Sequence, residues 1–336
     1  MAKAAWDCVG ERLDSGIVIT KHGHAQGPIT SLRIREAGHP VPDEDTFSAT
    51  EEALALTSGL TEADTVLFLL SGGGSALFEA PLVPPSELQD ITRQLLASGA
   101  DIVEMNTIRK RLSAVKGGRF AQLCAPAQVY SIVLSDILGD PLDMIASGPA
   151  YPDRSTCAQA RAIAEKYQLP LSDQARALLD QETPKELDNV ETVITGSVRE
   201  LCSAAAAVCQ RLGYETHILT DQLCCQAREA GSFLASIART HGQDGRSLAF
   251  LAGGETVVLL TGKGLGGRNQ ELALSAAEGI SGMDNALIFS LGSDGTDGPT
   301  DAAGGIVDGQ TQGKLAQAGL TIHQVLADND AYHALE

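Results

Sequence analysis

The sequence lacks the features that mark membrane-spanning, secreted and nucleic-acid-binding proteins. No apolar run approaches the ~20 residues that a bilayer-crossing helix needs, and the opening residues Met1–Asp7 contain no apolar signal core. Basic residues are scarce: 24 Lys and Arg stand against 43 Asp and Glu, a formal net charge of -19. This charge disfavours a nucleic-acid or anionic-membrane partner, and an anionic ligand needs local positive charge to bind.

Cysteines paired at the spacing of a zinc site are also lacking. The seven cysteines are an odd number and scattered, and Cys224-Cys225 has no companion pair. We therefore expect reduced thiols in a cytoplasmic protein. His22 and His24 have no third ligand nearby in the sequence and do not indicate a metal site.

The sequence contains no Gly-x-x-x-x-Gly-Lys-Ser/Thr phosphate-binding loop, but another glycine-rich turn stands out. The apolar run Val66–Leu70 is typical of a strand buried on both faces, and Ser71-Gly72-Gly73-Gly74-Ser75 follows it directly. Glycines let the backbone turn sharply and approach a ligand, and successive free N–H groups bind anions. The alternative is a tight turn without a ligand.

Alternating strand-like and helix-like stretches predict an α/β protein with mostly parallel sheets. The expected strands are 16–20, 66–70, 129–134, 192–197, 217–220, 248–252, 257–260 and 286–291, with 248–260 forming a hairpin. The expected helices are 4–13, 43–59, 86–99, 156–167, 172–181, one ending at 212, 226–241 and 268–280. Ser86 and Gln89 form a predicted capping box. A polar, Pro-containing stretch before residue 192 predicts two domains, 1–187 and 188–336.

Two loops of the second half are candidates for chemistry. Residues 262–267 match Gly-x-Gly-x-x-Gly, a weak dinucleotide signal here because the preceding strand belongs to the expected hairpin. Asp294, Asp297 and Asp301 form either a Mg²⁺ site or a solvated acidic turn, and Glu255 is a second candidate ligand.

In the first half, Asp136 directly follows an expected strand. Its carboxylate is placed either to take a proton from an attacking hydroxyl or to cap a helix. Residues 109–119 gather five basic side chains, which line an anion pocket or form a solvated helix face. We interpret His39, between Gly38 and Pro40, as structural.

These stretches together resemble one family, the glycerate 2-kinases of the MOFRL type, formerly often labelled hydroxypyruvate reductases. The resemblance covers essentially the whole chain. It rests on Ser71–Leu77, Asn106–Lys110, Val115–Arg119, Leu134–Asp136 with Gly139–Pro141, Ala146–Pro149, Ala252–Glu255, Gly266–Leu272 and Asp294–Gly304.

The resemblance implies ATP- and Mg²⁺-dependent phosphorylation of D-glycerate at its 2-hydroxyl. It implies two α/β lobes, the first Rossmann-like, with the active site in the cleft between them. The family's functional lysine, aspartate and arginine match Lys3, Asp136 and Arg268. The residues then expected to bind substrate or phosphate are Ser71, Gly72, Gly73, Gly74, Ser75, Asn106, Arg109, Lys116 and Gly267. The expected metal ligands are Asp294, Asp297 and Glu255.

The chain departs from the family pattern at both ends. Ala2 stands where the family has a glycine before the lysine, and the family continues before Lys3 and after Glu336. Two other functions therefore stay open, a shortened relative that binds ligand without turnover and an NAD(P)H-dependent hydroxypyruvate reductase. Association into a homodimer is compatible with the sequence.

Overall fold

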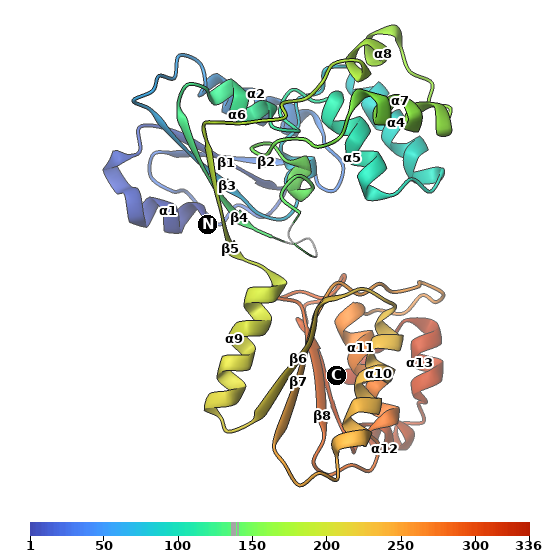
Figure 1. The fold of residues 1–336 in the computed structure, drawn as a ribbon. Helices are drawn as coiled ribbons and strands as arrows, with labels where there is room; N and C mark the ends of the chain where they lie inside the picture. Colours follow the sequence, from blue (N-terminus) through green and yellow to red (C-terminus); the bar gives the residue numbers. More distant parts are fainter. Residues whose placement is uncertain (136–138, 140) are drawn as a thin grey trace. The chain divides into compact units, whose positions relative to one another are not determined.

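The computed structural model describes residues 1–135, 139 and 141–336. The chain forms two compact units, Met1–Ser197 and Val198–Glu336, and each is described by itself (Figure 1). The sequence placed the boundary after residue 187, before strand β5 (Val190–Gly196). Because β5 pairs in parallel with β4 (Gln128–Leu134), it belongs to the first unit, and the units divide after it.

The first unit contains two parallel sheets. Strand β1 (Gly16–Lys21) pairs with β2 (Leu32–Ala37). Strand β3 (Thr65–Leu70) pairs with β4, which is the middle strand of the order β3-β4-β5. Phe68 on β3 packs against Phe78 and Phe120, which form part of a buried cluster. This sheet brings the carboxyl end of β3 to the glycine-rich turn.

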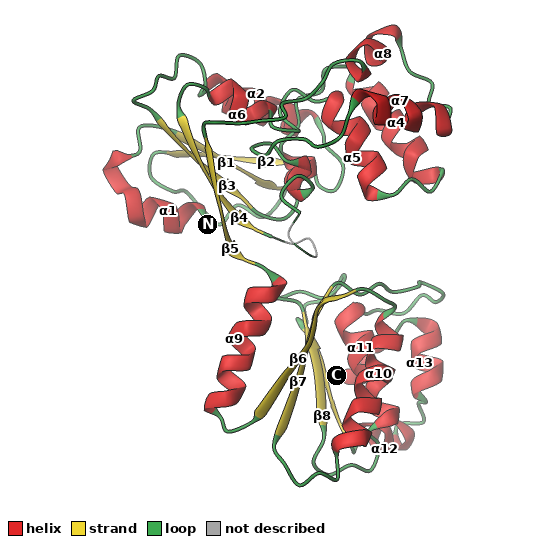
Figure 2. Cartoon of the chain, viewed as in Figure 1, coloured by secondary structure: helices red, strands yellow, loops and turns green. Residues whose placement is uncertain are grey.

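The described α-helices of the first unit are α1 (Ala2–Val9), α2 (Glu44–Ala55), the short α3 (Gly74–Leu77), α4 (Pro85–Ala97), α5 (Ile102–Arg111), α6 (Arg119–Cys124), α7 (Cys157–Lys166) and α8 (Asp173–Leu179). Helices α1, α2 and α6 lie beside the strands of the first unit, whereas α4, α5, α7 and α8 form a group to one side (Figures 1 and 2). Helices α4, α5, α7 and α8 share a second apolar cluster that includes Ile91, Leu95, Ile108 and Leu112, all nearly or fully inaccessible to solvent. This cluster fixes α5, which carries most of the basic stretch.

The second unit is layered, with α9 (Val198–Arg211) on one face of its strands and α10 (Ala227–His241) and α11 (Arg268–Gly279) on the other (Figure 1). Strands β6 (Glu215–Leu223) and β7 (Leu248–Gly254) are parallel, whereas β8 (Leu287–Leu291) and β9 (Gly304–Asp308) are antiparallel. Helix α11 lies in the core, where Leu274 and Ile280 are fully buried. The remaining helices are α12 (Thr311–Gln317), α13 (Ile322–Asp328) and α14 (Ala331–Leu335).

The α/β class and the mostly parallel sheets are confirmed, and some local predictions are wrong. Residues 257–260 form no strand, so the expected hairpin is absent; Val257 instead makes an isolated bridge to Gln226. Helix α4 begins at Pro85 after Pro84, without a side-chain cap, so the predicted Ser86 capping box is also wrong. Among the described helices, we find none with both the length and the apolar character that a membrane crossing requires.

Candidate active site

The glycine-rich turn after β3 is the centre of the candidate site in the first unit. Gly73 has φ +84°, a left-handed conformation that favours glycine, and it precedes the short helix α3. A Cβ on Gly74 would lie 2.7 Å from Cβ of Ala146, so this position also needs glycine. No described group accepts a hydrogen bond from the amides of Gly73, Gly74 or Ser75. The turn therefore offers free N–H donors to an anion.

Two cations hold the turn through the carbonyl of Ser75. Lys116 Nζ donates to that oxygen at 2.9 Å and to the carbonyl of Phe78 at 3.0 Å, and lies 3.4 Å from the Glu79 carboxylate. Burial lowers the pKa of Lys116 to about 8. The sequence predicted that Lys116 binds substrate, but its ammonium is fully buried and its contacts lie within the unit. These contacts make Lys116 a support for the turn.

Arg109 is the second cation. Its Nη2 donates to Ser75 O at 3.1 Å, its Nε is buried without an acceptor, and no described carboxylate pairs with it. An arginine without a counter-charge, beside free backbone amides, is suited to bind a carboxylate or phosphate.

Asn106 reaches the turn through a second serine. It is 2% exposed, and its Oδ1 accepts from Ser147 Oγ at 2.8 Å. The hydroxyl of Ser147 lies 3.4 Å from that of Ser75. Asn106 thus holds Ser147 beside Ser75 of the turn, whereas the sequence predicted that Asn106 binds substrate or phosphate directly.

His39 also lies at this turn, which the sequence interpretation did not foresee. It follows β2, and its imidazole approaches Gly73 closely: a Cβ on Gly73 would lie 3.1 Å from Cδ2 and 3.2 Å from Nε2 of His39. The sequence signal was the string Gly38-His39-Pro40. Its glycine and proline predict a turn, but they do not predict where the imidazole ring lies.

A second feature that the sequence missed lies where β1 ends and α2 begins. His22 Nε2 lies 2.8 Å from Asp43 Oδ2, and with Asp45 these residues offer ligand atoms within 4.8 Å of one another. Hydrogen bonds from His22 and from Thr46 and Gly38 outweigh the effect of burial and lower the pKa of Asp43 to about 2. The pairing explains His22 without a metal.

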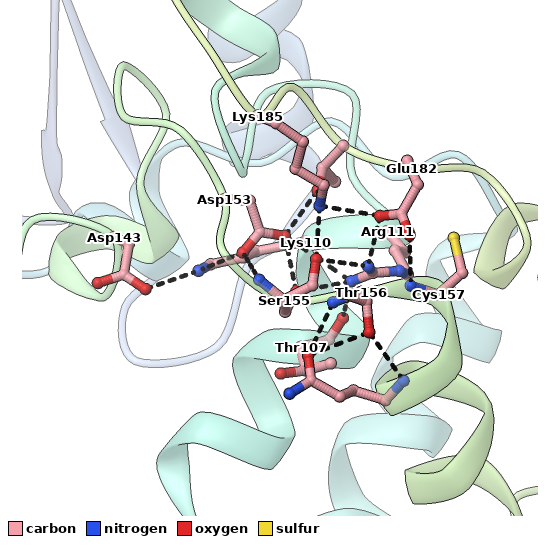
Figure 3. A network of polar contacts seen from close by, with 12 residues as sticks. Thr107, Lys110, Arg111, Asp143, Asp153, Ser155, Thr156, Cys157, Glu182 and Lys185 are labelled. Atoms are coloured by element: carbon pink, nitrogen blue, oxygen red, sulfur yellow. Dashed lines mark hydrogen bonds and ion pairs between the residues drawn. The ribbon is translucent and has the colours of Figure 1, made fainter.

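Of the other basic side chains of residues 109–119, Lys110, Arg111 and Lys116 are buried and Arg119 is partly buried. Lys110 and Arg111 belong to a network of polar contacts (Figure 3). Lys110 Nζ lies 3.1 Å from Asp153 Oδ1, and Arg111 donates to Ser155 Oγ at 2.8 Å. Arg119 donates to three carbonyl groups at the end of α5. Burial acts to raise the pKa of Asp153, but the charge of Lys110 and hydrogen bonds from Thr183 and Ser155 hold that pKa below its usual range.

The described structure does not test two of the predicted catalytic residues. Asp136 lies outside the described residues. Lys3 is exposed on α1, and no described group makes a hydrogen bond or ion pair with its ammonium. Their roles remain predictions.

In the second unit, Gly267 and Arg268 begin α11. Arg268 forms an ion pair with Glu255, and both side chains are about half exposed. The structure thus brings together a predicted anion-binding residue and a predicted metal ligand. A Cβ on Gly267 would lie 2.3 Å from the Asp297 carboxyl carbon, so this glycine makes room for Asp297.

Asp297 caps α11 and is poorly placed for the predicted metal. Its carboxylate accepts from the amides of Asn269 and Gln270 at 3.0 and 2.8 Å, and it is 2% exposed. These are contacts of a helix cap. Asp294 is exposed in the same loop and accepts from Thr296 N at 3.3 Å, so it keeps room for a metal ion.

Four amides of the Gly262–Gly267 loop, those of residues 262 to 265, are already satisfied by residues 328–330. Asn329 Oδ1 accepts from Thr261 N and Gly262 N at 2.7 and 2.8 Å, and Asp330 Oδ1 accepts from Leu265 N at 2.8 Å. A dinucleotide pyrophosphate needs such amides free. The Gly-x-Gly-x-x-Gly match is therefore a structural loop.

Comparisons with known proteins show the family of the chain. Residues 1–180 match a family model described as a domain of unknown function (DUF4147), and residues 248–336 match the MOFRL family. The chain is 52% identical to the D-glycerate 2-kinase of Thermotoga maritima, over 100% of this chain and 82% of that protein. The chain belongs to the MOFRL-type glycerate 2-kinase family. A glycerate 2-kinase of Pyrococcus horikoshii is 39% identical, over 100% of this chain and 79% of that protein.

A solved structure of a glycerate kinase shares this fold. The crystal structure of glycerate kinase from Thermotoga maritima matches with a TM-score of 0.96, covering 100% of this chain and 82% of that one. A relative from Agrobacterium vitis, 39% identical over 99% of this chain and 78% of its own length, is called a putative hydroxypyruvate reductase. The occupied amides of residues 261–265 do not favour that activity. A kinase family implies a nucleotide substrate.

Proposed function

We propose that this protein transfers the γ-phosphoryl group of ATP to the 2-hydroxyl of D-glycerate, giving ADP and 2-phosphoglycerate. The observation that carries the proposal is the similarity to the Thermotoga maritima D-glycerate 2-kinase, 52% identical across the whole of this chain. We also propose that it acts in the cytoplasm.

The described residues of the first unit support an anion site. Free amides of Gly73, Gly74 and Ser75 and the unpaired guanidinium of Arg109 offer hydrogen bonds and positive charge in a chain of net charge -19. Such donors stabilise the charge of a carboxylate or a transferring phosphoryl group. Ser71 and Gly72 are exposed beside them and complete the proposed cradle.

The chemical step needs a group that orients the hydroxyl and accepts its proton. We assign this role to Asp136, by its match to the family's functional aspartate. The hydroxyl oxygen attacks the γ-phosphorus, the bond to the bridging oxygen breaks, and ADP leaves. Arg268 and Lys3 are proposed to neutralise anionic groups of the substrates.

Asp294 and Glu255 fit a Mg²⁺ ion better than Asp297 does. Both are exposed carboxylates, and Mg²⁺ is commonly bound by one or two carboxylates together with substrate phosphates. When bound, the ion would neutralise phosphate charge. The Glu255 carboxylate pairs with Arg268, so Glu255 would exchange Arg268 for the metal ion when the ion binds.

The test is coupled turnover of ATP with D-glycerate and Mg²⁺, with the phosphoglycerate isomer identified. We expect 2-phosphoglycerate, and a loss of about 10²-fold or more in kcat/KM in Asp136→Asn and Arg268→Ala. Arg211→Ala, an exposed arginine on α9, is the matched control and should retain activity. A folded protein that binds Mg-ATP without turnover would instead support the non-catalytic relative.

A further inference from the structure

His39 is held at the glycine-rich turn by a constrained segment. A Cβ on the preceding Gly38 would lie 2.5 Å from Val41 O and 2.7 Å from the Asp43 carboxyl carbon, so the turn is closed tightly on itself. The Gly38 amide donates to Asp43 Oδ1 at 3.0 Å, and Asp43 caps α2 through Thr46 N at 2.9 Å. The backbone that carries His39 is therefore anchored to a helix.

The ring of His39 has no polar partner among the described residues. Neither nitrogen takes part in a hydrogen bond or ion pair there, and the residue is exposed. Nε2 nevertheless lies on the side toward Gly73, 3.2 Å from where a Cβ on that residue would be. An exposed imidazole usually turns to solvent, whereas this one is directed to a loop with free amides.

Three kinds of donor thus converge on one turn: the amides of Gly73–Ser75, the guanidinium of Arg109 and the imidazole of His39. Arg109 approaches from α5 through Ser75 O, and His39 approaches from the β2–α2 turn through Gly73. The two side chains come to the turn from separate elements, as expected for residues that enclose a small ligand.

We propose that His39 is a substrate-binding residue of this kinase, whose Nε2 donates a hydrogen bond to the anionic group held at the Gly73–Ser75 turn. The inference rests on the proposed function. Two sources share the required chemistry, the carboxylate of D-glycerate and a phosphate of the nucleotide. Glycine at position 73 is needed for the same reason, because any side chain there would press against the ring.

The experiment compares His39→Gln and His39→Phe with the wild type. Phe keeps the ring against Gly73 but removes the donor, so it separates packing from binding. We expect KM to rise about 10- to 100-fold for one substrate only, D-glycerate or ATP, with a smaller change in kcat and an unchanged melting temperature. His24→Gln, an exposed histidine of the β1–β2 loop, should leave all constants unchanged.

A second measurement does not depend on turnover and is made on the wild-type protein. The imidazole resonances of His39 in the wild-type protein, assigned by their loss in His39→Gln, are followed while D-glycerate or ATP is added alone. A shift with one of them identifies the bound group. No shift with either ligand, or KM values within twofold of wild type in both variants, would overturn the inference while leaving the kinase activity standing. Absence of turnover in the wild type would count against the proposed function only.

Discussion

Three of the basic residues in 109–119 are buried and stabilise the fold, whereas Arg109 is available to the candidate site. Lys110, Arg111 and Lys116 are at most 2% exposed and have carboxylate partners. Removing one partner of such a buried pair is costly because the other charge stays without compensation. Arg109 pairs with no carboxylate among the described residues and contacts the turn through Ser75 O, so it is the cation of this group that the candidate site can use.

The His22–Asp43 pair makes the β2–α2 turn sensitive to pH in both directions. The pKa of Asp43 is lowered to about 2, so its contribution is present above its ordinary pKa and lost as pH falls toward 2. The pKa of His22 is raised by its hydrogen bond to Asp43, so its contribution is present below its ordinary pKa and lost as pH rises through the raised value. The pair therefore stabilises the folded protein most between about pH 4 and 6.5.

We expect His22→Gln to lower the melting temperature at pH 5.5 and to have less effect at pH 3 and pH 8.5. Thermal unfolding of wild type and variant at the three pH values measures this. His24→Gln is the control, since that side chain has no described partner. A difference that is the same at all three values would show that the ion pair does not contribute.

At the scale of single elements, two glycines with similar backbone conformation separate the effect of the space above the turn after β3 from the effect of backbone strain. Gly73 and Gly59 have φ of +84° and +79°, but a Cβ on Gly59 meets nothing within 4 Å. Alanine at either position costs about 1 kcal/mol of stability. We expect Gly73→Ala to lose at least tenfold in kcat/KM, because the methyl group displaces His39, and Gly59→Ala to keep its activity.

Chemical unfolding and steady-state kinetics of both variants give the two quantities. Equal stability loss with unequal activity is the expected result. Equal activity would mean that the space above Gly73 is not used by the reaction.

The elements themselves were largely predictable where the pattern was local. The apolar run 66–70 stopped by glycines gives β3 directly. Strand β2 was missed because it has only two large apolar residues, Leu32 and Ile34. Arg33 and Arg35 alternate with them, are more exposed and pair with Glu52. Residues 257–260 are apolar like a strand, yet Val257, Leu259 and Leu260 are exposed, and Val257 O accepts from Ala227 N at the start of α10, a tertiary contact that periodicity does not report.

Site residues were predictable by type and less so by role. The sequence identified Lys116 and Asp297 as charged groups beside glycine-rich loops, and both lie there. Their partners decide their roles: Lys116 supports Ser75, and Asp297 caps α11. Neither partner is near in sequence, so the fold was needed to find them. The same holds for His39, whose direction depends on how β2 and β3 are brought together.

At the scale of the whole molecule, each unit has its own buried clusters. The described clusters each contain residues of one unit only, such as those around Ile108 and around Leu274. Asp153 compensates Lys110 in the first unit, and Glu271 accepts from Arg228 and Asn329 in the second. Units with separate cores are expected to unfold separately.

We therefore expect two thermal transitions, each sensitive to substitutions in one unit. Asp153→Asn should destabilise the first unit by about 3 kcal/mol, because Lys110 loses its buried counter-charge, and Glu271→Gln should lower the other transition. The single tryptophan, Trp6, lies in α1 and reports on the first unit alone. Its fluorescence midpoint should shift in Asp153→Asn and not in Glu271→Gln, while calorimetry detects both shifts. Asp180→Asn, which breaks an exposed ion pair, should move neither transition by more than about 1 kcal/mol. If both buried variants moved the tryptophan signal equally, the two units would unfold as one, and the stability of each site would depend on the whole chain.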